Sequence, residues 1–327
     1  PHLGLVGRHL GARSGLSMFV ALFPGQGSQR LGMGRAFYES SPAAREVLDA
    51  AEAALPGLLA LMWDGPEDEL RLTANQQPAL VAAGAAAYAA YLEAGGARPA
   101  YAAGHSLGEY TALVAAGSLD VADAVRLVRA RGTYMQEAVP EGQGAMAAVL
   151  KVEAQVVEDA LLEARATGVV EVANYNAPGQ TVISGQAAAV EAAAALLKER
   201  GARAVPLPVS APFHCSLMTP AAERLAEDLA RATFREPAFP VVCNVTARPL
   251  ASAADAPRLL TEQVTGSVRW VETLRWLAAT VGEGVRFVEF GSGEVLTGLV
   301  KRTLPGAWAG AVSDPAGLEE VLETHAG

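Results

Sequence analysis

The sequence predicts an α/β protein: a large domain with a mostly parallel sheet, and a small subdomain inserted into it. Two short apolar runs, residues 19–23 and 100–103, each end in a glycine-containing turn followed by an Ala-rich segment with helical spacing. Strand–turn–helix units of this kind are typical of parallel sheets covered by helices. Residues 144–208 have a different order, strand–helix–strand–strand–helix–strand, which is that of ferredoxin-like folds. A chain of 327 residues is long enough for both parts.

The elements of the large domain are expected in alternating order along the chain. After the strand at 19–23, a helix is expected to carry Gln77 at its start, and another to end at Ala116 because a glycine follows it. Asp120 is expected to cap the next helix. Toward the C-terminus the pattern predicts an apolar return of the chain at 240–245, a helix at 268–280 and a strand at 285–290.

The inserted ferredoxin-like subdomain is expected to comprise residues 143–208, so that the large domain consists of residues 18–142 and 209–327. Prolines and glycines frame the insert on both sides. Its predicted segments are, in order, a strand at 145–150, a helix at 152–166, strands at 169–174 and 181–184, a helix at 187–200 and a strand at 202–207. The two middle strands are predicted to be joined across residues 175–179.

Residues 1–17 differ from the rest of the chain, since they contain no acidic residue. A secretory signal needs a continuous apolar centre, which Gly7, Arg8 and His9 interrupt. We expect this segment to be a leader outside the fold, with a targeting peptide as the alternative.

Composition excludes several classes of protein. The net charge of −10 argues against a protein that coats nucleic acid, which would present a basic face. Two cysteines are too few for a disulfide framework, so a cytoplasmic location is expected. The longest apolar stretch, residues 79–92, is shorter than the about 20 residues of a membrane-spanning helix. We therefore expect neither nucleic acid nor a membrane among the partners.

Gly104-His105-Ser106-Leu107-Gly108 matches the G-x-S-x-G pattern of a nucleophile elbow, with an apolar strand before it and a helix after it. In a hydrolase-like parallel sheet such a turn projects the serine hydroxyl above the sheet edge, near a helix N-terminus that can stabilise an oxyanion. The alternative is a chance match, because short patterns of small residues recur in Gly-rich proteins.

A serine nucleophile requires a base, and elimination among the histidines favours His214, which lies in a loop after the last strand of the insert. His105 neighbours Ser106 and is expected to point away from it. The remaining histidines lie in the leader or at a C-terminus expected to be frayed: His2, His9 and His325. The pattern offers no acidic residue to orient His214, which is unlike an ordinary esterase.

The Gly25-Gln26-Gly27-Ser28-Gln29 turn follows the first strand. It lacks the lysine of a phosphate-binding loop, and a backbone N–H from it fits better as the second donor of an oxyanion hole. A tight turn that merely requires glycine is the alternative.

Arg131 falls within the apolar stripe of the helix that follows Asp120. A guanidinium on a buried face requires an anionic partner. Spacing alone favours an internal Asp or Glu over a substrate carboxylate.

Together these segments resemble the bacterial malonyl-CoA–acyl carrier protein transacylases, from Met18 almost to the C-terminus. The motifs that carry the resemblance, in chain order, are Phe23-Pro24-Gly25-Gln26-Gly27-Ser28-Gln29, Gln77-Pro78-Ala79, Gly104-His105-Ser106-Leu107-Gly108-Glu109-Tyr110, Arg131-Gly132, Asn174-Tyr175-Asn176-Ala177-Pro178-Gly179-Gln180, Pro212-Phe213-His214-Cys215 and Val295-Leu296-Thr297-Gly298-Leu299.

The resemblance implies that Ser106 takes a malonyl group from malonyl-CoA, with His214 as the base, and that acyl carrier protein then receives it. It assigns the backbone carbonyl of Gln263 to the orientation of His214, and the backbone N–H groups of Gln26 and Leu107 to the oxyanion hole. It implies a substrate-binding set around the malonyl group: Arg131, which pairs with the carboxylate, Phe213, His105 and Asn176. The substrate is itself a coenzyme A thioester, and no metal or other cofactor is expected.

Phe213 stands where many bacterial relatives have a small residue before the histidine. Phe213, like Leu107, resembles the malonyl-selective acyltransferases of polyketide synthesis, and its ring is expected to crowd a methyl branch on the substrate. A role in fatty acid synthesis is expected, with polyketide synthesis as an alternative.

Two other functions stay open: a serine hydrolase or thioesterase acting on acyl thioesters, and a non-catalytic docking module. A monomer is expected, with a local basic patch for the acidic carrier that has Arg126, Arg129, Lys198 and Arg203 as candidates.

Overall fold

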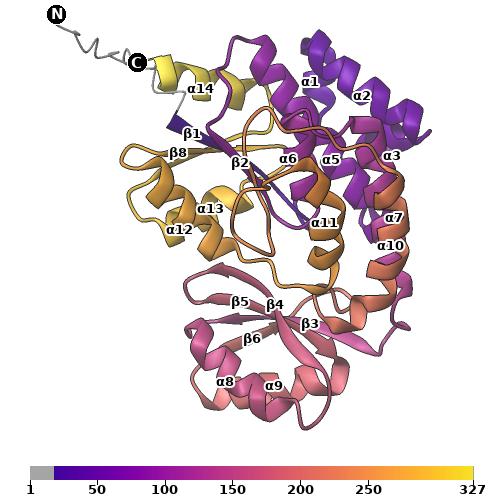
Figure 1. The fold of residues 1–327 in the computed structure, drawn as a ribbon, viewed down its shortest axis with the longest axis vertical. Helices are drawn as coiled ribbons and strands as arrows, with labels where there is room; N and C mark the ends of the chain where they lie inside the picture. Colours follow the sequence, from indigo (N-terminus) through magenta and orange to yellow (C-terminus); the bar gives the residue numbers. More distant parts are fainter. Residues whose placement is uncertain (1–17, 327) are drawn as a thin grey trace, which may run out of the picture.

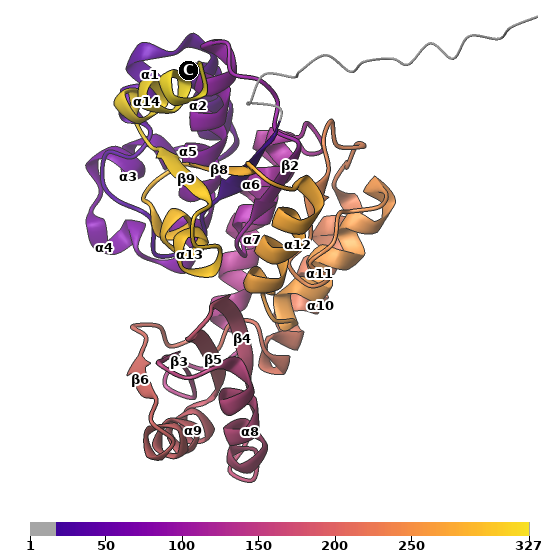
Figure 2. The same cartoon turned by 90° about the vertical axis from the view of Figure 1, so that its left-hand side faces the viewer.

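The computed structural model describes residues 18–326, and the predicted leader at 1–17 lies outside these residues. The described chain forms a large part with a parallel sheet and a smaller part with an antiparallel sheet (Figures 1 and 2). The predicted α/β class, with a separate inserted subdomain, is confirmed.

The large sheet has five parallel strands in the order β7-β2-β1-β8-β9. Their bounds are β1 Phe19–Phe23, β2 Tyr101–Gly104, β7 Val241–Val242, β8 Arg286–Phe290 and β9 Trp308–Val312. Because side chains alternate along a strand, Phe19, Ala21 and Phe23 of β1 pack into one core, whereas Val20 and Leu22 pack into another. Helices cover both faces of the sheet. Because all of its strands are parallel, their carboxyl ends lie at the same edge.

Helices α12 and α13 pack on the second of these faces, and the larger core on the first face takes side chains from most of the others. The helices of the large part are α1 Arg35–Ser40, α2 Pro42–Ala54, α3 Leu58–Asp64, α4 Glu67–Leu70, α5 Thr73–Glu93, α6 Gly108–Ala115, α7 Val121–Glu137, α10 Thr219–Arg231, α11 Ala256–Thr265, α12 Trp270–Val281, α13 Val295–Thr303 and α14 Pro315–Ala326, with short 3-10 turns η2 Ser216–Met218 and η3 Ala253–Asp255.

Helix α5 begins at Thr73, four residues before the expected start at Gln77, and runs through Pro78. Proline cannot donate to the carbonyl four residues earlier, that of Ala74. The side chain of Arg129 on α7 donates to that carbonyl instead, with Nε 2.7 Å from the oxygen. The helix therefore continues where the sequence suggested a beginning.

Asp120 occupies the N-cap position of α7 as expected, but its side chain makes no capping bond, and its carboxylate pairs with Arg235 at 2.7 Å. A second expected detail, at the C-terminal helix, is wrong. His325 does not lie on a frayed end: it is buried against Phe19 and Trp308.

The small sheet is antiparallel, in the order β4-β5-β3-β6, as expected for a ferredoxin-like arrangement. Its elements are β3 Gly144–Leu150, α8 Ala154–Ala164, β4 Val170–Ala177, β5 Gln180–Gln186, α9 Ala187–Glu199 and β6 Arg203–Pro206. The apolar faces of α8 and α9 pack on this sheet and form a core of their own. These elements lie inside the predicted range 143–208, and the exact boundaries stay a prediction.

The hairpin of the small sheet is tighter than expected, since β4 continues to Ala177 and only Pro178 and Gly179 form the turn. The extension of β4 has a partner outside its own sheet. The N–H of Tyr175 donates to the Val268 carbonyl at 3.0 Å, and the Val268 N–H donates to the Ala173 carbonyl at 2.8 Å. This pairing attaches the small sheet to the segment between α11 and α12.

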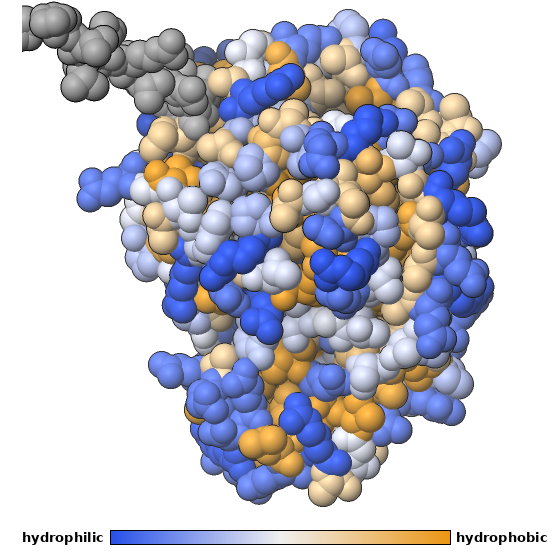
Figure 3. All heavy atoms as spheres, viewed as in Figure 1, coloured by the Kyte–Doolittle hydropathy of each residue, from blue (hydrophilic) through white to orange (hydrophobic). Residues whose placement is uncertain are grey.

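The surface in Figure 3 mixes polar and apolar side chains over both parts of the molecule. The exposed large apolar residues come from separate segments: Met18, Leu31, Leu72, Leu92, Leu162 and Val295. No helix within residues 18–326 combines the length and the apolar composition needed to span a membrane.

Candidate active site

Ser106 lies in a sharp turn between β2 and α6, at the carboxyl edge of the parallel sheet. Its φ of +55° is a left-handed conformation that is unfavourable for a residue with a side chain. The flanking glycines are required by close approach. A Cβ on Gly104 would lie 1.8 Å from the Gly108 carbonyl oxygen, and one on Gly108 would lie 2.2 Å from that of Phe23. The turn therefore has the geometry of a nucleophile elbow.

His214 faces the serine across the cleft, with Nε2 2.8 Å from Ser106 Oγ. Its Nδ1 lies 2.9 Å from the carbonyl of Gln263 and 3.2 Å from that of Gly266. Carbonyl oxygens only accept hydrogen bonds, so Nδ1 carries the proton and Nε2 can accept one from the serine. Burial, reinforced by the charge of Arg131, lowers the pKa of His214 to about 3. The imidazole is therefore neutral and available as a base.

Arg131 is fully buried, with 0% exposure, on α7. It donates from Nη1 to Gln77 Oε1 at 2.8 Å, and from Nη2 to Ser106 Oγ at 3.0 Å and Gln263 Oε1 at 3.1 Å. These oxygens are neutral, and among the described residues no carboxylate forms an ion pair with this guanidinium. The directly paired carboxylate that spacing favoured is therefore not found within residues 18–326. Burial lowers the pKa of Arg131, and the buried Glu109 opposes this shift only by electrostatic attraction over a longer distance.

The backbone N–H groups of Gln26 and Leu107 belong to two loops: the loop after β1, where Gln26 lines the cleft with Ser106, and the serine turn itself. Within the described part of the chain neither donates a hydrogen bond to another protein group. Gly25 makes the approach of the first loop possible, because a Cβ there would lie 2.6 Å from the His105 carbonyl oxygen. An oxyanion hole requires N–H groups without a protein partner, and the assignment of Gln26 and Leu107 to it stays a prediction.

The cleft above Ser106 has a volume of about 820 Å³ and lies between the large and small parts of the molecule. Gln26, His105, Phe213 and Asn176 line it together with the serine and His214. His105 turns its Nε2 toward Asn176 Oδ1, at 2.7 Å, and not toward the serine. Burial lowers the pKa of His105, and the bond to Asn176 opposes this shift. Three of the predicted substrate-binding residues thus line one cleft, whereas Arg131 lies beneath its surface and reaches it through Ser106 Oγ.

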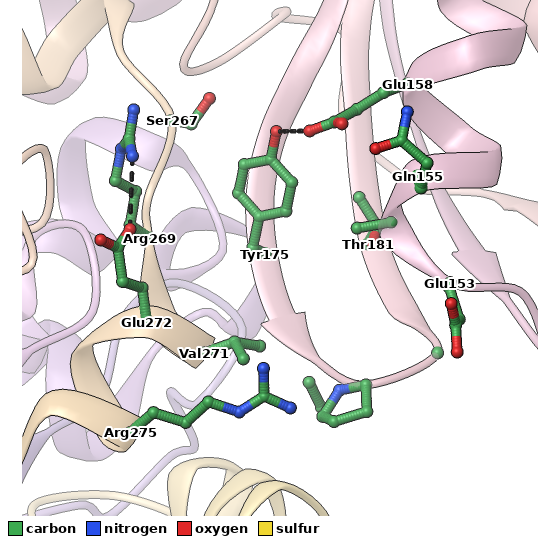
Figure 4. Close-up of a pocket in the computed structure, with 14 residues that line it drawn as sticks. Glu153, Gln155, Glu158, Tyr175, Thr181, Ser267, Arg269, Val271, Glu272 and Arg275 are labelled. Carbon is green, nitrogen blue, oxygen red and sulfur yellow. Dashed lines mark hydrogen bonds and ion pairs between the residues drawn. The ribbon is translucent and has the colours of Figure 1, made fainter. Parts of the chain in front are cut away.

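A second cavity, of about 710 Å³, lies on the opposite face of β4 (Figure 4). Asn174 and Asn176 face the serine cleft, whereas Tyr175 faces this second cavity, as the alternation of a strand requires. Two pairs of its polar groups bond to each other: Tyr175 donates to Glu158 at 2.6 Å, and Arg269 to Glu272 at 3.3 Å. This cavity contains none of the predicted site residues.

Three residues near the serine had no role assigned from the sequence: Gln77, Glu109 and Asn244. Gln77 holds Arg131, and Glu109 accepts from the N–H of Asn244 at 2.7 Å. Burial raises the pKa of Glu109 to about 7, although bonds from Asn244 and Gln263 oppose the shift. Gln77 and Glu109 could have been found from the sequence, because each belongs to a motif shared with the family that the chain resembles. No pattern in the sequence indicates a role for Asn244.

The candidates for a carrier-binding patch do not form one cluster. Arg126 is exposed on α7 and lies 3.7 Å from Asp123, while Arg129 is committed to the Ala74 carbonyl. Lys198 and Arg203 are exposed on the small subdomain.

A serine beside a neutral base can accept an acyl group, and N–H groups without a protein partner can stabilise the oxyanion that forms. This fold and this cleft therefore define an α/β enzyme that transfers acyl groups. The family profile described as "Acyl transferase domain" matches residues 19–305. The chain belongs to this acyltransferase family.

Similar proteins agree with this assignment over nearly the whole chain. The malonyl CoA-acyl carrier protein transacylase of Escherichia coli (strain K12) is 47% identical over 312 residues, 94% of this chain and 100% of that protein. That of Bacillus subtilis (strain 168) is 46% identical over 313 residues, 94% of this chain and 98% of that protein.

Solved structures show the same fold. The acyl-carrier-protein S-malonyltransferase of Burkholderia pseudomallei 1710b has a TM-score of 0.89 at 48% identity, covering 93% of this chain and 99% of that one. A malonyl-transacylase solved in complex with a type II PKS acyl-carrier protein has a TM-score of 0.90 at 44% identity, covering 94% and 100%.

Proposed function

We propose that this enzyme transfers a malonyl group from malonyl-CoA to the pantetheine thiol of acyl carrier protein through a malonyl-serine intermediate. The observation that carries the proposal is Arg131: a buried cation 3.0 Å from the Oγ of the candidate nucleophile, with only neutral partners among the described residues. A malonyl carboxylate would supply the missing negative charge, and a planar guanidinium can bind it in bidentate fashion. The curated relatives named above support the same substrate and carrier.

In the first half-reaction Ser106 Oγ attacks the thioester carbonyl carbon while His214 Nε2 accepts the hydroxyl proton. The negative charge that develops on the carbonyl oxygen is held by the N–H groups of Gln26 and Leu107. When the carbon–sulfur bond breaks, His214 returns its proton to the coenzyme A sulfur. Malonyl-serine and coenzyme A are the products of this step.

In the second half-reaction the pantetheine thiol of the carrier gives its proton to the same histidine and attacks the acyl-serine. The serine oxygen leaves and regains the proton from His214. The carbonyls of Gln263 and Gly266 keep the imidazole in the required tautomer through both steps. No metal or redox cofactor is needed for this chemistry.

Fatty acid synthesis is the proposed destination of the malonyl group, with polyketide synthesis as the alternative. We further propose that the enzyme works in the cytoplasm as a monomer, without nucleic acid or a membrane as partner.

The competing function is hydrolysis of the acyl-serine, and the fate of that intermediate separates the two. Enzyme loaded with malonyl-CoA and freed of excess substrate is expected to retain its acyl group in buffer and to lose it rapidly when carrier protein with its pantetheine arm is added. Intact mass spectrometry follows both. Equal loss with and without the carrier would identify a thioesterase, and the carrier lacking its pantetheine arm serves as the control.

Phe213→Ser is expected to relax selectivity toward methylmalonyl thioesters, because the buried ring lines the cleft beside the serine. Hydrophobic contacts discriminate a methyl group by about 1–3 kcal/mol. The ratio of kcat/KM for malonyl-CoA to kcat/KM for methylmalonyl-CoA is therefore expected to fall by about 10- to 200-fold at most. Phe234→Ser, which removes a ring outside the cleft, is the control. An unchanged ratio in Phe213→Ser would show that the ring does not contact the acyl group.

A further inference from the structure

The turn that carries Ser106 is held from the neighbouring strand by one side chain, Asn244, which lies just after β7. Strands β7 and β2 pair in parallel, with Val242 opposite Ala103. Their carboxyl ends therefore lie side by side, and the residue after β7 comes next to the turn after β2. Asn244 is 1% exposed, and its side-chain amide is engaged by the serine turn and by Gln263.

The amide of Asn244 contacts the turn on both sides of His105. Its Oδ1 accepts from the Ser106 N–H at 2.8 Å, and its Nδ2 donates to the Gly104 carbonyl at 2.7 Å. Asparagine offers an acceptor and a donor on one short planar group, which this pair of contacts requires. One of these bonds is made to the backbone of Ser106 itself, whose φ of +55° directs the hydroxyl toward His214.

Asn244 is itself held in place by buried groups from two other elements. Its N–H donates to Glu109 Oε1 at 2.7 Å, and its Oδ1 accepts from Gln263 Nε2 at 3.3 Å. The backbone carbonyl of Gln263 in turn accepts from His214 Nδ1 at 2.9 Å. One chain of hydrogen bonds thus runs from the backbone of the serine to the ring of the histidine.

We propose that Asn244 is a positioning residue: by bridging Gly104 and Ser106, it maintains the strained backbone that places the serine hydroxyl against His214. The inference rests on the proposed function, since it takes Ser106 as the nucleophile. It assigns to Asn244 an effect on the reactivity of the serine and not on the binding of substrate.

Asn244→Asp separates positioning from packing, because the two side chains have nearly the same shape. A carboxylate still accepts from the Ser106 N–H but sets an oxygen against the Gly104 carbonyl and a negative charge beside Glu109. Burial and the like charge of Glu109 both raise the pKa of such a carboxyl group. Protonation at lower pH restores an O–H donor for the Gly104 carbonyl. Gln263 also contacts Arg131 and His214, whose own ionisation can change the rate with pH. Each rate is therefore divided by the wild-type rate at the same pH.

The measurement is the rate at which phenylmethylsulfonyl fluoride labels Ser106, followed by intact mass, together with kcat and KM for malonyl transfer. At about pH 8, Asn244→Asp is expected to be labelled about 100-fold more slowly than the wild type, the size of effect that a small misplacement of a reacting group produces. The ratio to wild type is expected to rise toward about pH 5.5, as the carboxyl group is protonated. KM for malonyl-CoA is expected to stay near the wild-type value while kcat falls.

Asn75→Asp is the matched control, since Asn75 Nδ2 also donates to a backbone carbonyl, that of Glu69, outside the elbow. It is expected to follow the wild type at every pH. Asn244→Ala, which loses both bonds and gains no charge, is expected to react slowly at every pH without recovery, and it decides the matter if Asn244→Asp does not fold. Wild-type rates in either Asn244 variant, or a deficit in Asn244→Asp that does not change with pH, would overturn the proposal. Labelling does not require malonyl-CoA, so failure of the wild type to transfer malonyl groups would contradict the proposed function alone.

Discussion

Replacement of Ser106 by alanine is expected to abolish formation of the malonyl-enzyme. Within residues 18–326 the hydroxyl is the hydrogen-bond partner of the neutral Nε2 of His214, at 2.8 Å, so its removal leaves the base without a nucleophile to activate. Loss of a nucleophilic serine that acts together with its histidine reduces turnover by about 10⁶-fold in enzymes of this chemistry. Intact mass after exposure to malonyl-CoA measures the effect directly, since the wild type is expected to gain one acyl group and the variant none.

The fold of Ser106→Ala is expected to persist, because alanine keeps the Cβ and the left-handed backbone strain is the same. Ser252→Ala is the matched control: it removes a hydroxyl at η3, outside the cleft, and is expected to be acylated like the wild type. A malonyl group on the Ser106→Ala protein would show that the nucleophile is a different residue.

Arg131→Ala is expected to eliminate most malonyl transfer while leaving acetyl transfer unchanged or faster. Without the guanidinium, the malonyl carboxylate enters a buried site unpaired, and truncating one partner of such a pair costs about 2–5 kcal/mol. Malonyl kcat/KM is therefore expected to fall by about 30- to 4,000-fold. An acetyl group carries no charge and loses nothing by the change. The pKa of His214 rises when the neighbouring cation is removed, since that charge helps to lower it, and a stronger base favours acetyl transfer.

The melting temperature of Arg131→Ala tests the same assignment from the side of stability. Breaking a buried ion pair costs about 3–5 kcal/mol, but Arg131 bonds only to neutral oxygens among the described residues. We expect a decrease of less than about 4 °C, which corresponds to about 1–2 kcal/mol in a chain of this size. Arg126→Ala, an exposed arginine on the same helix, is the control. A strongly destabilised Arg131→Ala with an unchanged malonyl-to-acetyl ratio would contradict the assignment.

Elements that repeat a local pattern could be predicted closely from the sequence. The expected strand at 19–23 coincides with β1, and the ferredoxin-like order of the insert is the one observed. The error at α5 has a specific cause. Proline favours the first turn of a helix, so Pro78 suggested a beginning there, yet a side chain from α7 satisfies the carbonyl that proline leaves free. A contact between helices far apart in the chain decided where α5 begins.

Some residues of the candidate site could be predicted from the sequence, and others could not. The elbow at Ser106 is visible because strand, glycines and helix lie next to each other in the sequence, and His214 emerged because few histidines compete with it. Gln263 was assigned only by resemblance, since a backbone carbonyl leaves no trace in residue type. Asn244 left no signal at all, although it touches the nucleophile's own backbone.

The sequence by itself determined the fold class, the order of elements in the insert, where the serine turn lies and to which family its motifs belong, because each of these depends on residues close together in the chain. Only the tertiary structure decided what surrounds Arg131, which tautomer His214 adopts and what holds the backbone of Ser106. Those contacts join β2, α7, α11 and the loop after β7, which meet because parallel strands place their carboxyl ends at one edge of the sheet. The hydrophobic spacing of a helix indicates that a residue such as Arg131 is buried. It does not indicate which atoms surround that residue, because those atoms come from elements far away in the chain.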